Sequence, residues 1–155
     1  MDGSERPIVI LLADDDADDR DMTRRALEKN RLANDFYTVA DGEELMDFLH
    51  HRGNYAPPAL SPTPGIILLD LNMPRMDGRE ALAEIKRDPE LRRIPVVVLT
   101  TSQADQDIFR TYDLGSNSFI TKPVTFAALV EVVRVLGQYW FEIVRLPDTH
   151  NEARR

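Results

Sequence analysis

Three consecutive carboxylates end the first strongly apolar run of the chain. The apolar residues 8–13 lead directly into Asp14, Asp15 and Asp16. At about 5 Å and an effective dielectric near 20, each pair of like charges costs about 3 kcal/mol. Capping of the following helix by aspartate explains one or two of these residues but not the whole cluster. The motif therefore indicates a site for a divalent cation, with helix capping as the alternative.

The elements that would position these groups follow an alternating pattern. Short apolar runs typical of strands lie at residues 8–13, 36–40, 66–69, 96–99 and 118–121. Amphipathic stretches typical of helices lie at residues 18–30, 41–51, 78–88, 104–114 and 125–144. Strands that alternate with helices in this way predict an α/β fold with a parallel sheet.

Polar side chains follow four of the expected strands. They are Asp14 and Asp15, then Asp70, then Thr100 and Thr101, and finally Thr121 with Lys122. Because the carboxyl ends of parallel strands meet at one edge of a sheet, we expect these groups to converge. An all-oxygen cluster favours a hard cation such as Mg²⁺. A phosphoryl group could bind beside the metal and Lys122, which makes Asp70 a candidate nucleophile.

Composition limits the classes of function. The 155 residues, 43% of them apolar, suit one domain, which we place at residues 1–146 with a polar tail at 147–155. Four of the ten prolines lie in residues 52–64, which predicts an extended surface loop. A formal net charge of −8 argues against nucleic acid. No apolar run approaches the roughly 20 residues that span a bilayer, and we expect a cytoplasmic protein that does not bind membranes.

The helix expected at residues 125–144 would be roughly 30 Å long and would overhang the sheet. One apolar stripe faces the sheet, and a second set of apolar side chains lies beside and beyond it: Val132, Val135, Tyr139, Trp140 and Phe141. A monomer would be expected to cover such a surface. We therefore predict a homodimer through this helix, with a tail folded back over its own helix as the alternative.

Four blocks of sequence carry a family resemblance. They are ILLADDD at residues 10–16, LLDLNMPRMDG at 68–78, PVVVLT at 95–100 and FITKP at 119–123. Together they resemble the receiver domains of response regulators in two-component signalling. The resemblance implies a doubly wound, flavodoxin-like sheet of five parallel strands in the order 2-1-3-4-5, flanked by five helices. It also implies Mg²⁺-dependent transfer of a phosphoryl group from a sensor histidine kinase onto Asp70.

The same resemblance implies a role for each matching residue. The implied Mg²⁺ ligands are Asp15, Asp70, the main-chain carbonyl of Asn72 and, through water, Asp14. Thr100 and Lys122 would contact phosphoryl oxygens, and Thr100 and Phe119 would form the switch. Receiver domains frequently have a tyrosine at this position. Because Phe119 lacks the tyrosine hydroxyl, switching here would depend on packing. Taken singly, each of these residues also has an ordinary structural interpretation, as strand filler, core or surface.

The loop at 52–64 and the long last helix also resemble the small single-domain regulators that partner bacterial phytochromes. The implied kinase is then a phytochrome, and the chain would be a phosphoacceptor that catalyses only its own phosphorylation and dephosphorylation, with its output through protein binding. A Mg²⁺-dependent phosphatase with an aspartyl nucleophile is one alternative, but Asn72 stands where such enzymes place a second aspartate. A receiver-like adaptor that is never phosphorylated is the other alternative, disfavoured because every expected site residue is present.

Overall fold

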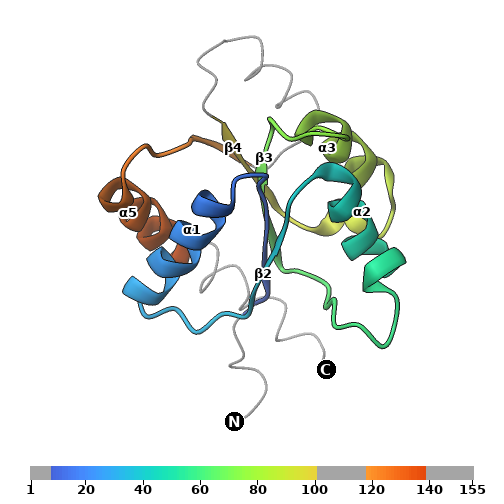
Figure 1. Cartoon of the computed structure of the whole chain (residues 1–155), viewed down its shortest axis with the longest axis horizontal. Coiled ribbons are helices and arrows are strands. Elements are labelled where there is room, and N and C mark those ends of the chain that lie inside the picture. Colours follow the sequence, from blue (N-terminus) through green and yellow to red (C-terminus); the bar gives the residue numbers. More distant parts are fainter. Residues whose placement is uncertain (1–7, 101–117, 139–155) are drawn as a thin grey trace.

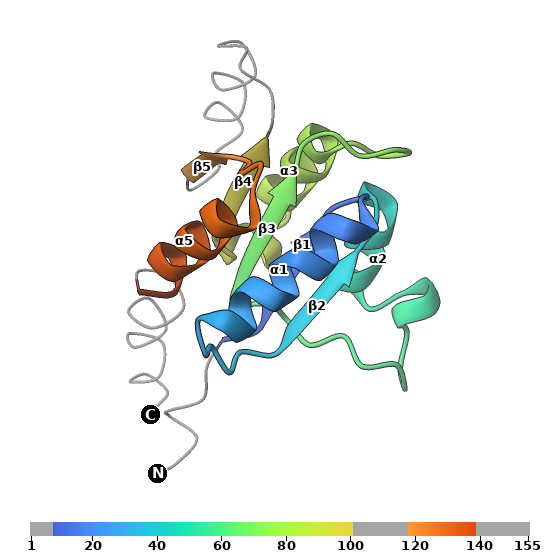
Figure 2. The same ribbon diagram turned by 60° about the vertical axis from the view of Figure 1, so that its left-hand side comes forward.

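The computed structural model describes residues 8–100 and 118–138, apart from the side chains of Thr100, Ser118 and Phe119. Within them lies a five-stranded sheet with the order β2-β1-β3-β4-β5, in which every neighbouring pair is parallel. The strands are β1 (Ile10–Ala13), β2 (Phe36–Val39), β3 (Ile66–Asp70), β4 (Val96–Thr100) and β5 (Ser118–Thr121). Figure 2 shows the strands running in one direction. The predicted strand order and fold class are confirmed.

Helices cover both faces of this sheet (Figure 1). The helices α1 (Ala17–Lys29) and α5 (Phe126–Leu136) pack on one face, and α2 (Gly42–His50) and α3 (Gly78–Arg87) pack on the other. The central strands β1 and β3 are buried along their whole length. Continuous apolar runs are typical of parallel strands that are covered on both faces, which is why β1 and β3 have no alternating pattern.

The predicted boundaries differ from the structure in a few places. The first apolar run begins at Ile8, but β1 begins at Ile10 because Ile8 packs against the core without joining the strand. An apolar side chain indicates that a residue packs against the core, and here the packed segment begins two residues before the strand does. The helix predicted at 104–114 lies outside the described residues. Of the helix predicted at 125–144, the structure describes α5 and one π-type turn at 137–138.

The region 52–64 is less extended than the prolines predict. It contains the short 3-10 helix η2 (Gly53–Tyr55), followed by exposed residues and a cis peptide between Pro57 and Pro58. The Tyr55 ring packs on Phe48 of α2, and its hydroxyl donates to Glu44. These contacts hold the start of the loop against α2, although proline composition alone predicts an open surface segment.

Aspartate caps explain part of the acidic cluster. The Asp16 carboxylate accepts hydrogen bonds from the backbone N–H groups of Asp18 and Asp19 at the start of α1. The capping alternative is therefore right for Asp16, and it leaves Asp14 and Asp15 to be explained by something else. Within the described residues, no helix has the length and apolar character needed to cross a membrane.

The start of α3 packs against the end of β3 so closely that only glycine fits. A Cβ atom on Gly78 would lie 2.5 Å from the Asp70 carbonyl oxygen and 2.6 Å from the Leu71 Cα. We expect Gly78→Ala to lower the free energy of unfolding by about 2 kcal/mol, because backbone must move to relieve the overlap.

Urea denaturation measures this change. Gly137→Ala is the matched control, since the atoms nearest to its Cβ, from 3.1 Å, belong to the flexible side chain of Leu32, and it should change stability by less than about 1 kcal/mol. Equal effects of the two substitutions would contradict the steric argument.

Candidate functional site

Three carboxylates form an acidic pocket at the carboxyl ends of β1 and β3. Ala13 pairs with Leu69 in the sheet, so the next residues, Asp14 and Asp70, emerge side by side. One carboxylate oxygen from each of Asp14, Asp15 and Asp70 lies within 4.8 Å of the others. Asp14 and Asp70 are only 1% and 4% exposed, whereas Asp15 is exposed. The structure therefore brings together the three aspartates that the strand ends predict.

Lys122 reaches this pocket from the loop that follows β5. Its Nζ lies 2.9 Å from Asp14 Oδ2, 3.2 Å from Asp70 Oδ2 and 2.7 Å from Asp19 Oδ2. The ammonium group thus binds two carboxylates of the acidic pocket and a third on α1. The sequence places Lys122 here and counts Asp19 in the acidic cluster with Asp18 and Asp21, but it gives Asp19 no role at the site, because an acidic residue in the first turn of a helix is common.

Backbone groups bind the remaining oxygens of the two buried carboxylates. The N–H of Asp16 donates to Asp14 Oδ1 at 2.9 Å, and the N–H of Asn72 donates to Asp70 Oδ1 at 3.1 Å. Each carboxylate therefore has one oxygen on a backbone amide and the other on Lys122. Buried polar groups are stable only when they are paired in this way.

The charges of the pocket are only partly balanced. Burial raises the pKa of Asp14, although hydrogen bonds from Lys122 and the Asp16 backbone oppose the shift. Burial likewise raises the pKa of Asp70 against the Asn72 backbone N–H and the Lys122 charge. Burial alone would lower the pKa of Lys122, but its hydrogen bonds to Asp14 and Asp19 outweigh that effect and raise it. The charge balance follows from the groups themselves, because one ammonium faces the carboxylates of Asp14, Asp70 and Asp19, and Asp15 lies beside them.

The donor set fits Mg²⁺. The pocket offers carboxylate oxygens, and the group of possible metal ligands found among the described residues contains no histidine. Oxygen ligands of this kind suit a hard cation that keeps several of its waters. Asp15 and Asp70 can hold the ion with the main-chain carbonyl of Asn72, and Asp14 can bind it through water; these roles remain predictions.

Contacts with the start of α2 hold the loop that carries Asn72. Arg75 adopts a left-handed backbone conformation with φ of 66°, and its Nη2 lies 2.7 Å from Asp41 Oδ2 at the start of α2. The N–H of Gly42 donates to the Met76 carbonyl at 2.9 Å. The loop after β3 is thereby fixed to α2, which limits how far Asn72 can move.

The predicted switch residues are placed by their backbone alone. Thr100 ends β4 and pairs with Thr121, while Phe119 pairs with Val98 in the neighbouring strand. Thr100 thus lies at the carboxyl end of β4, and Phe119 lies within β5, the strand that leads to Lys122. Their side chains are outside the described part of the chain, so their switch role stays a prediction.

Asp70→Asn should stabilise the metal-free protein at neutral pH. The charged carboxyl is disfavoured by burial. The asparagine oxygen can still accept from the Asn72 N–H, and Lys122, which would face the asparagine Nδ2, keeps Asp14 and Asp19 as its partners. Because the pKa of Asp70 is raised in the folded state, wild-type stability rises as pH falls through that pKa. The advantage of the variant should therefore shrink in acid.

Urea denaturation with a chelator present, repeated at several pH values, measures this difference. Asp18→Asn is the control, because the exposed Asp18 side chain favours the α1 N-terminus and its loss should lower stability by about 0.5 kcal/mol. An Asp70→Asn variant less stable than wild type at neutral pH would show that the buried charge is fully compensated.

Comparison with known proteins agrees with this geometry. Residues 10–134 match the model of the response regulator receiver domain. The response regulator Rcp1 of Synechocystis sp. (strain ATCC 27184 / PCC 6803 / Kazusa) is 42% identical over 146 residues, which cover 94% of this chain and 97% of Rcp1.

Two solved structures are also similar. The phosphorylated cyanobacterial phytochrome response regulator RcpA has a TM-score of 0.79 at 44% identity, with 86% of this chain and 93% of RcpA covered. The Mn²⁺-bound form of Rcp1 has a TM-score of 0.80 at 41% identity, with 88% and 96% covered. The resemblance to regulators of the phytochrome type is confirmed, and the chain belongs to the family of response regulator receiver domains.

Proposed function

We propose that this chain is a single-domain response regulator that accepts a phosphoryl group on Asp70 from the phosphohistidine of a sensor histidine kinase. The observation that carries the proposal is the position of Asp70. Its carboxylate is buried at the carboxyl end of β3, beside Lys122 and within reach of two further aspartates. Receiver domains are signalling domains, so the output is a change in protein binding.

The transfer follows from the groups present. A carboxylate oxygen of Asp70 forms a bond to phosphorus while the P–N bond to the donor imidazole breaks, and that bonding pair stays on the imidazole nitrogen. In the unphosphorylated structure Lys122 Nζ lies 3.2 Å from Asp70 Oδ2. After the transfer Lys122 pairs with a phosphoryl oxygen, and the Thr100 hydroxyl donates to another. Bound Mg²⁺ supplies charge neutralisation for the phosphoryl oxygens. The chain catalyses only its own phosphorylation and dephosphorylation.

Relatives support the metal and the kinase. Rcp1 has been solved with Mn²⁺, and RcpA, a phytochrome response regulator, in its phosphorylated form. We accordingly propose Mg²⁺ as the cofactor, a bacterial phytochrome as the kinase partner and the cytoplasm as the location. Thr100 and Phe119 act as the switch between the two states, with Phe119 moving by packing alone.

Labelling with a small acyl phosphate tests the phosphoacceptor. With acetyl phosphate and Mg²⁺ we expect one hydroxylamine-labile phosphoryl adduct per chain, located on Asp70 by mass spectrometry of its peptides. Asp70→Asn should abolish the adduct, because no equivalent oxygen nucleophile remains. Asp16→Asn, which keeps the α1 cap acceptor, should be labelled like wild type. A stable adduct elsewhere, or no adduct with any donor, would overturn the proposal.

We also propose a homodimer through α5. Leu129, Val133 and Leu136 are buried against the rest of the fold, but Val132 is only partly buried and Val135 is 49% exposed. Apolar side chains that remain exposed along one helix are typical of an interface. The other predicted contacts, Tyr139, Trp140 and Phe141, lie outside the described residues.

Sedimentation velocity at micromolar concentration tests the dimer. We expect wild type to sediment as a dimer and Val135→Glu as a monomer, because a carboxylate would be buried without a partner. Leu60→Glu is the control, since Leu60 is 73% exposed on the loop that follows η2, and should leave the dimer intact. A wild-type monomer both with and without phosphorylation would remove the proposal.

A further inference from the structure

The shortest ionic contact of Lys122 leads away from the acidic pocket. Nζ lies 2.7 Å from Asp19 Oδ2, compared with 2.9 Å from Asp14 Oδ2 and 3.2 Å from Asp70 Oδ2. Asp19 belongs to α1 and is not among the three aspartates whose oxygens could hold one metal ion. Lys122 thus connects the metal site to a carboxylate outside it.

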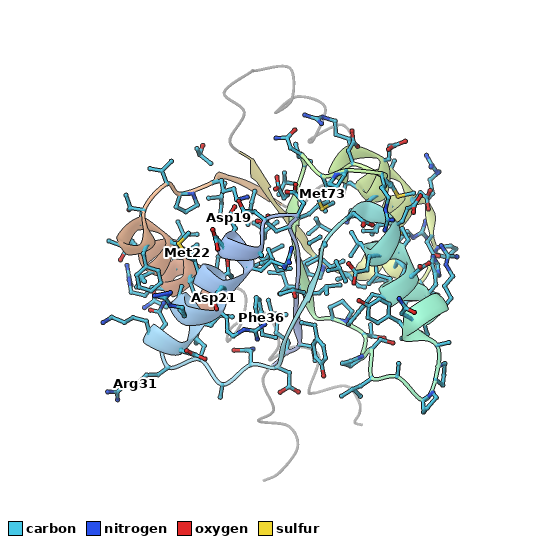
Figure 3. The ribbon with its side chains drawn as sticks, in the orientation of Figure 1. Asp19, Asp21, Met22, Arg31, Phe36 and Met73 are labelled. Carbon is cyan, nitrogen blue, oxygen red and sulfur yellow. The ribbon has the colours of Figure 1, made fainter. Side chains whose placement is uncertain are left out.

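Asp19 is held firmly enough to act as an anchor. Its backbone N–H donates to Asp16 Oδ1 at 3.2 Å, and its carbonyl accepts from Thr23 Oγ1 at 2.8 Å. The side chain lies at the start of α1, where the helix meets the carboxyl ends of the strands (Figure 3). The first turn of the helix therefore fixes the backbone of Asp19 beside Lys122.

There is also space on this side of Lys122. A cavity of about 20 Å³ borders Asp19 and Lys122, and apolar side chains of α1, β4 and α5 line it as well. They are Met22, Leu99 and Leu129. Apolar walls lower the local dielectric and strengthen the attraction between the ammonium and the Asp19 carboxylate. Because Nζ already lies 2.7 Å from Asp19 Oδ2, the ammonium can keep this partner, and the cavity leaves room beside it when the contact with Asp70 is lost.

The contacts of Lys122 affect how readily the acidic pocket can bind a metal ion. Lys122 and a cation compete for the same Asp70 carboxylate, because the ammonium already contacts Oδ2. A cation can take Asp70 at low cost only if Lys122 keeps other partners when that contact, the longest of the three, is lost. Asp14 alone would leave a largely buried ammonium with one carboxylate, since Lys122 is only 14% exposed.

We propose that Asp19 is a positioning residue, which holds the Lys122 ammonium when Mg²⁺ takes the Asp70 carboxylate. The inference rests on the Mg²⁺ site of the proposed function. Without Asp19, Lys122 would remain on the carboxylates of the acidic pocket and would oppose the metal. With Asp19 in place, two of the three ammonium hydrogens stay bonded and the third is free to meet a phosphoryl oxygen.

Calorimetric titration with Mg²⁺ alone, without any phosphoryl donor, tests the inference. We expect Asp19→Asn to weaken Mg²⁺ binding about tenfold, which is typical of a lost partner outside the ligand set. Asp18→Asn removes the same charge from the same helical turn, has an exposed side chain and should change the Kd by less than about twofold. Asp19→Glu, which keeps a carboxylate, should bind Mg²⁺ more tightly than Asp19→Asn.

A double-mutant cycle separates positioning from simple charge removal. In a Lys122→Gln background, Asp19→Asn should no longer weaken Mg²⁺ binding, because the residue it acts through is absent. NMR of the Lys122 ammonium protons needs no Lys122 variant. In Mg²⁺-loaded wild type they should exchange slowly with water, and in Mg²⁺-loaded Asp19→Asn they should exchange faster.

The outcomes distinguish this inference from the proposed function. If wild type binds no Mg²⁺ at the acidic pocket, both are overturned. If wild type binds Mg²⁺ and Asp19→Asn matches Asp18→Asn, or if its effect persists without Lys122, the role of Asp19 alone is overturned.

Discussion

Two neighbouring carboxylates, Asp14 and Asp70, lie buried under the ammonium group of Lys122, and the elements around them are arranged to hold them there. Parallel pairing of β1 with β3 places Asp14 and Asp70 side by side, and both are almost fully buried. Two such charges are costly away from water. Lys122 and two backbone amides pair with their oxygens, but the same ammonium also faces Asp19, and Asp15 adds a further carboxylate to the pocket. With one ammonium for four carboxylates, the site has room for a further cation.

Neighbouring elements are shaped to keep this site in place. Gly78 lets α3 begin directly against the backbone of Asp70, and Arg75 fixes the loop between them to α2. On the other side of the sheet, Arg20 donates to the Asp14 carbonyl from α1 at 2.8 Å. These three contacts therefore hold the buried carboxylates in place. A fold selected only for stability would avoid burying them, so function and stability conflict here.

Sequence reasoning predicted the part of the site that follows from strand direction. The apolar runs before Asp14 and Asp70 identify two buried parallel strands, and parallel strands bring their carboxyl ends to one edge, so the meeting of these aspartates with Lys122 needs no further information. The link between Lys122 and Asp19 could not be predicted in this way. It depends on how α1 is rotated against β5, and a helix of this composition has several acidic side chains that could meet the lysine.

The same distinction explains the errors in the boundaries. A hydrophobic pattern reports burial, so it predicts that Ile8 belongs to the strand, although Ile8 only packs against the core beside it. Proline content reports the absence of regular backbone, so η2 was missed although Tyr55 packs on Phe48 there. Long-range side-chain contacts decide both cases, and a local pattern does not contain them.

A crystal structure of the protein grown with Mg²⁺ would show whether the buried carboxylates hold a cation. We expect an ion bound by the carboxylates of Asp15 and Asp70 and by the main-chain carbonyl of Asn72. Lys122 would then be bonded to Asp14 and Asp19 and withdrawn from Asp70. An ion bound away from these aspartates, or Lys122 still bonded to Asp70 beside the bound metal, would contradict this expectation.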